Sequence, residues 1–426
     1  MKKIICWIVL GCFFGMHLFA QKTIAIHCGR LLDARTGKVL NNQTILVKGN
    51  RIDTIGTGLQ GDTTIDLSGY FVLPGLIDCH THVLLQADIT PEDYNVQLLK
   101  ESIPMRTIRA IGSCNKSLQN GFTTIRDLGT EGAGFADVDL KNAIEKGYID
   151  GPRMFVSTLA INTTGHYGIK ASDYSWELQM PKGLQEITGA DEARKAVRSQ
   201  LEHGADWIKI YADRGYYKTK EGVYRSLPNF TTEELYAITD EASRSHKKVA
   251  VHAMTRDGII ASINAGITTI EHGSGMDDEC IELMVAKHIF WCPTLFINDY
   301  MAEGRAKIGN NMNMLFRETQ PELFKKAIAA GVRLAYGTDI GGYDWSLPQA
   351  KDFEYFVLWG LTGVQAIQTA TITAAQLLDQ EGYLGEIKKG AFADIIAVKG
   401  DPTRNIQLLQ QVKWVMKNGK IYKNEL

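Results

Sequence analysis

Short apolar segments alternate with amphipathic stretches through most of the chain. From residue 71 onward, β-branched apolar segments recur eight times, and helical patterns lie between most of them. Eight strands that alternate with helices predict an α/β fold, a (β/α)8 TIM-like barrel, whose functional residues gather at the C-terminal ends of the strands. We expect these strands at residues 71–77, 123–127, 153–157, 207–211, 248–251, 268–271, 289–292 and 333–336.

Local signals place several of the helices. Thr231 stands three residues before Glu234, which is the spacing of a capping box and predicts a helix within residues 229–238. Helices are also expected at residues 257–265, 277–287 and 321–330, and the first and last of these end at a glycine.

The two ends of the chain have β character instead. Residues 22–70 contain short β-branched segments and no useful helix, and strand patterns return at 390–398 and 412–419. A β unit of this size cannot close a core alone. We therefore expect residues 21–72 and 385–426 to form one discontinuous β-sandwich domain, and residues 73–384 to form the barrel.

The first twenty residues have a separate character. Lys2 and Lys3 precede an apolar run that ends at Ala20, which predicts a signal peptide over residues 1–20. The alternatives are a retained membrane anchor, or lipoprotein cleavage near Cys12. Cleavage after Ala20 predicts a periplasmic or secreted protein with no stable membrane span after signal removal. The five cysteines that remain are scattered, and we expect buried thiols rather than a disulfide framework.

Composition narrows the class of partner. The chain has 426 residues, of which 45% are hydrophobic and 22% charged, as in soluble globular proteins. The net charge is −2 and no block of like charge occurs, so nothing favours nucleic acid as a partner.

Two histidines follow the first predicted barrel strand. His80 and His82 are separated by one residue, and side chains at i and i+2 of a strand point to the same side. Neutral imidazole is the commonest protein ligand for metals, but one such pair is weak evidence alone. The rest of the chain must therefore supply the other ligands.

Further ligand candidates occur at or near the ends of other strands. His252, His272 and Asp339 follow strands five, six and eight, and Lys209 lies inside strand four. Each histidine alone would be an ordinary core residue, and the aspartate a helix cap. A buried ammonium is costly, however, whereas a neutral lysine can take up carbon dioxide as a carbamate that bridges two cations. Together the six residues predict two adjacent metal sites.

Several motifs resemble one known superfamily. The chain is similar to amidohydrolases, in the branch near imidazolonepropionase that contains Xaa-Pro and Xaa-Arg dipeptidases and an ochratoxin-hydrolysing amidase. The matching stretches span nearly the whole mature chain in family order: PGLIDCHTH, TTIRDLG, GADWIKIYA, VAVHA, IEHG, GTD and GEIKKGAFADIIAV. The resemblance implies a distorted barrel with a terminal β-sandwich and a binuclear centre. It implies one metal on His80, His82 and Asp339, a second on His252 and His272, and carboxylated Lys209 between them.

Cofactors and catalytic groups follow from this resemblance. Two divalent metal ions are expected, with zinc favoured by the mixed nitrogen and oxygen ligands, although manganese, cobalt or nickel would also fit. Carbon dioxide is expected as the carbamate on Lys209. Asp339 is expected to act as general base and then as general acid. His166 matches a family histidine that holds the substrate carbonyl, the alternative being an ordinary loop histidine.

The residues after His252 bear on the reaction. The mononuclear deaminases of the superfamily place a glutamate shortly after this histidine; the present chain has none there and keeps the bridging lysine, which favours amide hydrolysis. Met254 occupies a position where dipeptidases often carry Tyr or His for the substrate carboxylate. Arg256 or Tyr211 could bind the substrate instead, and Tyr211 is equally compatible with packing.

Three segments are expected to set specificity as loops: residues 162–190, 214–228 and 297–319. Their aromatic residues would equally suit a homo-oligomer contact. We predict a metal-dependent hydrolase of a small-molecule amide, either peptide-like or an N-acyl amino acid. The alternatives are a hydrolase of cyclic amides, lactones or esters, and a non-catalytic binding protein.

Overall fold

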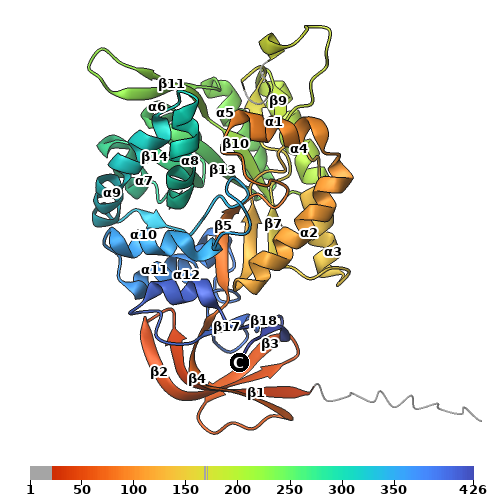
Figure 1. The fold of residues 1–426 in the computed structure, drawn as a ribbon, viewed down its shortest axis with the longest axis vertical. Coiled ribbons are helices and arrows are strands. Elements are labelled where there is room, and N and C mark those ends of the chain that lie inside the picture. The colour runs from red at the N-terminus through yellow and green to blue at the C-terminus, as the bar shows by residue number, and fades with distance from the viewer. Residues whose placement is uncertain (1–21, 167–168, 170) are drawn as a thin grey trace, which may run out of the picture.

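The computed structural model describes residues 22–166, 169 and 171–426 (Figure 1). The predicted signal peptide lies outside these residues. In the described part of the chain, no helix is long and apolar enough to cross a membrane. All five cysteines from Cys28 onward are free and buried, as predicted.

Eight strands form the barrel, as the hydrophobic pattern predicted. They are β5 (Leu76–Thr81), β6 (Phe122–Asp127), β7 (Arg153–Val156), β10 (Trp207–Tyr211), β13 (Lys248–Thr255), β14 (Thr269–Gly275), β15 (Phe290–Cys292) and β16 (Arg333–Leu334). Neighbours pair in parallel within β5-β6-β7 and within β10-β13-β14-β15-β16. Backbone hydrogen bonds join these two groups on both sides, from Cys79 N to Tyr336 O and from Asp206 N to Val156 O, each at 2.8 Å. These bonds close the ring.

Helices surround the strands (Figure 1). They are α1 (Pro91–Lys100), α2 (Ile103–Gln119), α3 (Ala136–Glu145), α4 (Ala190–Glu202), α5 (Thr232–Arg244), α6 (Arg256–Ala265), α7 (Asp278–Ala286), α8 (Leu295–Lys307), α9 (Met312–Ala330), α10 (Asp352–Leu358), α11 (Gly363–Thr369) and α12 (Ile372–Leu377). The predicted capping box is present at the start of α5, where Thr231 and Glu234 bond each other's backbone N–H groups. Helix α6 ends at Gly266, which has a left-handed φ of 90°.

Both ends of the chain share one seven-stranded sheet, at the opposite end of the molecule from the hairpin of β11 (Asp213–Lys218) and β12 (Tyr224–Pro228) (Figure 1). Its strands are β1 (Thr23–Asp33), β2 (Lys38–Lys48), β3 (Arg51–Gly56), β4 (Thr63–Pro74), β17 (Ile395–Val398), β18 (Trp414–Lys417) and β19 (Lys420–Asn424). Strand β17 pairs antiparallel with β4, so C-terminal residues extend the N-terminal sheet. The predicted combination of a barrel with a β unit built from both termini is thus confirmed.

The first predicted strand, residues 71–77, belongs to two elements. Residues up to Pro74 end β4 in the terminal sheet, and Leu76 begins β5 in the barrel. Gly75 lies at the crossing, where a Cβ atom would meet the Thr123 side chain at 2.2 Å. Only glycine allows the backbone to pass this close, and a continuous apolar run gives no sign of the change of sheet.

Two segments predicted as loops are ordered elements. Residues 297–319 lie mostly in α8 and in the first part of α9, which begins at Met312 rather than at the predicted Pro321. Residues 214–228 lie in an antiparallel hairpin of β11 (Asp213–Lys218) and β12 (Tyr224–Pro228), which projects from the barrel (Figure 1). Strand β8 (Ile161–Thr163) lies at the start of segment 162–190, and the short strand β9 (Gln185–Ile187) lies within it.

Candidate metal centre and active site

Three predicted ligands meet at the C-terminal end of the barrel. His80 lies on β5, His82 directly follows it, and Asp339 follows β16. One ligand atom of each lies within 4.8 Å of the others. The Asp339 Oδ1 atom is 3.3 Å from His82 Nε2 and 3.5 Å from His80 Nε2. Backbone bonding fixes this arrangement, because Asp339 N donates to His80 O at 2.8 Å.

The other predicted ligands adjoin this group. The ring centroid of His272, on β14, is 5.0 Å from that of His80 and 4.6 Å from that of His252, on β13. Lys209 lies on β10 and is fully buried. The register of the strands pairs Lys209 with Ala250 and Tyr211 with His252, so Lys209 lies two residues below the end of its strand. The structure therefore brings all six residues to one end of the barrel.

Hydrogen bonds to Nδ1 orient three of the imidazoles. His80 Nδ1 contacts Glu271 Oε2 at 2.9 Å, and His82 Nδ1 contacts the Gly129 carbonyl at 3.0 Å. His272 Nδ1 contacts Thr294 Oγ1 at 2.7 Å. Acceptors at Nδ1 place the ring proton there and leave the Nε2 lone pair for a metal, which is how ligating histidines are usually supported.

Glu271 and Arg126 form a buried support behind His80. Arg126 donates from Nη2 to Glu271 Oε1 at 2.8 Å and from Nε to the Cys79 carbonyl at 2.6 Å. Burial alone would raise the pKa of Glu271, but Arg126 and His80 lower it to about 2. The carboxylate therefore stays ionised and holds the His80 ring. This pair could not be predicted from the sequence, because the two residues are far apart in the chain.

The protonation preferences differ within the cluster. Burial, followed by the nearby Lys209 charge, lowers the pKa of His80 to about 4 and that of His252 to about 3. Burial also lowers the pKa of His82, but the Asp339 carboxylate more than offsets this effect and raises it to about 9. For Asp339 burial raises the pKa, yet the surrounding histidines hold it well below its usual range.

Two buried nitrogens in the cluster have no hydrogen-bond partner among the described residues: His80 Nε2 and Lys209 Nζ. Burial lowers the pKa of Lys209 to about 8. Unpaired buried polar atoms are costly, and a bound cation with a lysine carbamate would satisfy both. The donor set of imidazoles and carboxylate fits a divalent metal centre.

Backbone strain accompanies the ligands. His272 has a φ of 68°, and Asp339 has a φ of 62°. Left-handed conformations of residues other than glycine are costly and persist where the surroundings impose them, often at functional sites.

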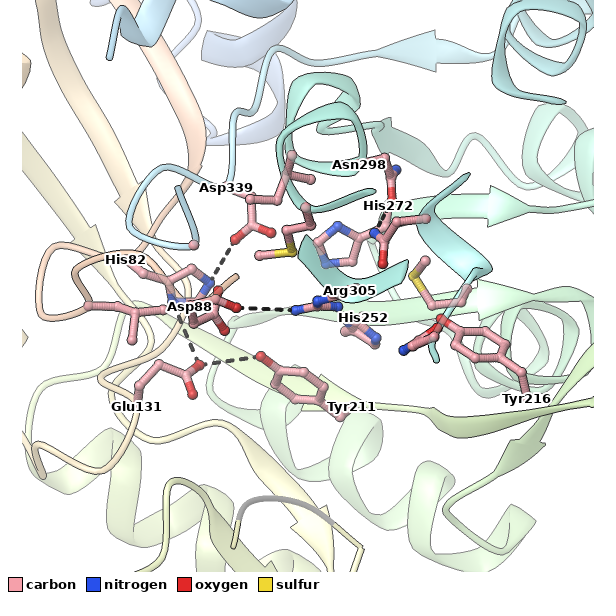
Figure 2. Close-up of a pocket in the computed structure, with 17 residues that line it drawn as sticks. His82, Asp88, Glu131, Tyr211, Tyr216, His252, His272, Asn298, Arg305 and Asp339 are labelled. Carbon is pink, nitrogen blue, oxygen red and sulfur yellow. Dashed lines mark hydrogen bonds and ion pairs between the residues drawn. The ribbon is translucent and has the colours of Figure 1, made fainter. Parts of the chain in front are cut away.

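A cavity of about 200 Å³ opens above the cluster (Figure 2). His82, His252, His272 and Asp339 form one part of its wall, and Tyr211 adjoins them, stacked on His252 at 4.5 Å. The remaining lining residues come from loops, from helices and from strands β11 and β13: Leu85, Asp88, Glu131, Tyr216, Met254, Ile297, Asn298, Met301, Arg305, Asn310, Asn313 and Gly342.

Two predicted substrate residues lie elsewhere. The residues that line this cavity include neither His166 nor Arg256. Arg256, at the start of α6, pairs with Glu279, with Asp277 at 3.1 Å and with Asp257 at 3.6 Å. His166 is half-buried in the segment that follows β8. Their contact with substrate stays a prediction.

The cavity instead contains charged residues that the sequence analysis did not single out. Arg305 belongs to α8, and Asp88 and Glu131 follow β5 and β6. Glu131 accepts hydrogen bonds from Tyr94 at 3.0 Å and from Tyr211 at 3.3 Å. For Asp88 and Glu131, the only signal in the sequence was that each follows the end of a predicted strand. Arg305 gave no signal, because the segment that forms α8 was expected to be a loop.

Comparison with known proteins identifies several relatives. A model of the amidohydrolase family matches residues 71–422. The chain is 31% identical over 376 residues to an ochratoxinase of Aspergillus niger, which covers 83% of this chain and 75% of that protein.

Solved structures give a similar result. A Xaa-Pro dipeptidase with methionine bound in its active site has a TM-score of 0.84 at 33% identity, covering 94% of this chain and all 100% of that chain. A prolidase complexed with N-methylphosphonate-L-proline has a TM-score of 0.82 at 28% identity, covering 94% of this chain and 100% of that chain.

Proposed function

Since this chain belongs to the amidohydrolase family and is a metal-dependent hydrolase that cleaves amide bonds, we propose that its substrates are dipeptides or N-acyl amino acids. The convergence of His80, His82 and Asp339, with Nδ1 of both histidines already engaged, carries the proposal of hydrolytic chemistry at this site. Two structural neighbours, by their descriptions, are a Xaa-Pro dipeptidase and a prolidase. Their bound ligands, methionine and a proline derivative, support an amino acid as the amine half of the substrate.

We propose two divalent ions, zinc foremost, as the cofactors. His80, His82 and Asp339 would hold one ion, and His252 and His272 the other. When bound, the ions polarise the amide carbonyl and lower the pKa of the attacking water. The cavity is small, which supports a small-molecule amide as the substrate.

Lys209 is proposed to carry the bridging carbamate. Its neutral amine would attack carbon dioxide and lose one N–H proton, which leaves an anionic group with two oxygen donors. Burial of Nζ, the lack of a hydrogen-bond partner for it in the described chain, and a pKa of about 8 all support this reaction, because a substantial fraction of the amine is neutral in mildly basic solution.

Asp339 is proposed to move the proton. Its carboxylate lines the cavity and stays ionised beside the histidines, so it can take a proton from the attacking water. It then delivers that proton to the nitrogen of the leaving amine as the C–N bond breaks. Tyr211, held by Glu131, faces the same cavity and would limit access of solvent to the amide.

The test is hydrolysis of a dipeptide library and of N-acyl amino acids by protein supplied with zinc and bicarbonate. We expect cleavage of one of these classes and two metal ions per chain. Lys209→Ala should lose metal and at least about 100-fold in kcat/KM, since it removes the bridging group.

His203→Ala is a matched control, because His203 is exposed and lies outside the cavity. It should retain metal and activity. Full turnover by Lys209→Ala would rule out the carbamate. Two bound metals without cleavage of either substrate class would rule out the proposed substrates.

The place of action is also a proposal. The paired lysines and apolar run of residues 1–20 support export to the periplasm or medium. Cell fractionation and N-terminal sequencing of the mature protein test this, and an intact N-terminus on cytoplasmic protein would contradict it.

A further inference from the structure

The cavity has an uneven distribution of charge. Its lining carries three carboxylates, Asp88, Glu131 and Asp339, but Arg305 is the single arginine or lysine among the lining residues. Figure 2 labels Arg305 and Asp88 among the side chains that surround the same space as His82 and His252. Any anionic group of a substrate that enters this space can therefore meet one fixed cation besides the metal centre.

Arg305 has hydrogen bonds but no ion pair. Its Nε donates to the Ile89 carbonyl at 3.1 Å, and its Nη2 reaches the Asp88 carbonyl at 3.5 Å. Among the described residues, no carboxylate oxygen lies within 4.0 Å of it, and Nη1 makes no hydrogen bond. Two backbone carbonyls thus fix the guanidinium and leave its remaining donors available.

Two other arginines near this end of the barrel are paired with carboxylates, whereas Arg106 is buried with all its hydrogen bonds to backbone carbonyls. Arg317, on the neighbouring helix α9, lies 3.3 Å from Glu303 and 3.6 Å from Asp299. Arg256, at the start of α6, lies among three carboxylates. A half-buried guanidinium without a carboxylate partner is costly unless a ligand supplies the missing charge.

The acidic neighbours of Arg305 do not take this role. Glu131 already accepts hydrogen bonds from Tyr94 and Tyr211. The Asp88 side chain has a buried Oδ1 without a hydrogen-bond partner in the described chain, although it lies near enough to Arg305 for electrostatic attraction. The Arg305 charge is therefore moderated but not paired.

Arg305 also stands at a junction. A second hollow, lined by Pro91, Tyr94 and Ile308 among others, shares Asp88, Arg305 and Asn310 with the cavity above the metal ligands. A carboxylate held at this junction would leave the rest of a small substrate within the first cavity, where the candidate ligands lie.

We propose that Arg305 binds the free carboxylate on the amine half of the substrate and so selects amides of amino acids. This inference rests on the proposed function and names the residue that enforces its substrate class. The planar guanidinium can hold both carboxylate oxygens, and charge-assisted bonds of this kind are about twice as strong as neutral ones.

The test compares the best-cleaved dipeptide of the library with its C-terminal carboxamide. We expect wild-type protein to prefer the free acid, and Arg305→Met to lose roughly 10- to 100-fold in kcat/KM on the acid, mainly through KM. The same variant should change turnover of the carboxamide by less than about threefold, since that substrate presents no anion. The kcat/KM of Arg305→Lys on the free acid should lie between the values of the wild type and of Arg305→Met.

Arg317→Met is the matched control, since it removes an arginine from the same helix pair without touching the cavity. It should keep the preference for the acid. Loss of the preference in Arg256→Met, with Arg305→Met unchanged, would overturn the proposal, as would equal cleavage of acid and carboxamide by the wild type.

A binding measurement separates this inference from the proposed function and from misfolding. Calorimetry with zinc-loaded protein should show tighter binding of L-methionine than of L-methioninamide, and Arg305→Met should remove this difference while keeping two metals and its melting temperature. If the wild type cleaves nothing but still shows the difference, only the proposed reaction fails. If the wild type binds both compounds equally, the role of Arg305 fails. If Arg305→Met does not fold, equal binding of the two compounds by Arg305→Gln supports the proposal, and a retained difference in that variant overturns it.

Discussion

His82 differs from its neighbours in its affinity for protons. The Asp339 carboxylate 3.3 Å away raises its pKa to about 9, whereas burial keeps His80 and His252 neutral at pH 7. In the metal-free protein, the protonated His82 ring therefore forms an ion pair with the Asp339 carboxylate, where the proposed metal ion would otherwise bind. Because a raised histidine pKa means that the protonated form stabilises the fold, this contribution is complete below pH 6.5 and is lost as the pH rises through 9.

Metal uptake should show the opposite dependence on pH. Zinc needs His82 without its proton, and carbon dioxide needs Lys209 neutral, so affinity should rise between pH 6 and pH 9. At pH 7 binding should release protons. Calorimetry in two buffers of different ionisation enthalpy measures this release, and identical heats in both buffers would contradict the prediction.

At the scale of residues, the six candidate ligands could be found from the sequence because each stands at or near the end of a predicted strand. The motifs also predicted the family and the amide-hydrolysing reaction, and both are confirmed. The supporting residues Glu271 and Arg126 could not be found, since their role depends on a contact between distant strands. The sequence alone does not show whether Arg256 or Arg305 faces the cavity. The structure distinguishes them, because Arg256 is paired with carboxylates outside the cavity and Arg305 lines it.

At the scale of elements, the projecting hairpin is attached to the end of β13 by the Asp213 carboxylate and by Ser226, whose backbone N donates to Thr255 Oγ1 at 2.8 Å. Asp213 Oδ2, at the start of β11, accepts from Ser226 Oγ at 2.6 Å and from the Met254 and Thr255 amides at 2.8 and 3.1 Å. These bonds join both hairpin strands to the end of β13. Tyr216 of the hairpin lines the cavity and packs against Phe316 of α9 at 5.8 Å.

Asp213→Ala should therefore affect both stability and substrate binding. It leaves the buried Met254 and Thr255 amides without this acceptor, while Ser226 Oγ keeps its contact with Thr255 Oγ1, and it should cost about 2–4 kcal/mol in the free energy of unfolding. Urea denaturation measures the loss, and KM should rise as Tyr216 shifts. Asp257→Ala is the control: its carboxylate is partly exposed and over 3.5 Å from its arginine partners, so the change should stay below about 1 kcal/mol. Equal effects of the two variants would disprove the attachment.

The elements that the sequence predicted poorly are those that surround the cavity. Residues 297–319 and 214–228 have mixed polar and aromatic patterns, so neither helix nor strand periodicity was visible, yet they form α8, part of α9 and the hairpin. Their order comes from tertiary contacts such as those of Asp213 and Phe316. Buried barrel strands, by contrast, are defined by their own apolar runs.

At the scale of the whole molecule, the terminal sheet and the barrel are continuous through one glycine. Strand β4 pairs with β17 as far as Pro74, and β5 begins at Leu76 and leads directly to His80. Gly75 N donates to the Asp394 carbonyl at 2.8 Å, and Leu76 N donates to the Gly121 carbonyl at 3.0 Å. We expect the sheet and the barrel to unfold in one transition.

Gly75→Ala tests this coupling. The new methyl group would meet the Thr123 Oγ1 position at 2.2 Å and the Thr123 Cβ at 2.9 Å, which should cost about 1–3 kcal/mol and lower metal affinity through β5. Gly112→Ala is the control, because nothing lies within 4 Å of its added Cβ on α2 and alanine favours helix by roughly 1 kcal/mol. Calorimetric unfolding should give one peak in each variant; two separate peaks for Gly75→Ala would contradict the coupling.

The ligands also determine when the centre can be assembled. His80 and His82 leave the ribosome early, whereas Asp339 follows the last barrel strand and meets them only after the ring closes. A nascent chain thus has no complete binding site, and the order is folding first, metal second. We therefore expect the metal supply at the place where the ring closes, rather than the supply during synthesis of His80 and His82, to decide which ion binds.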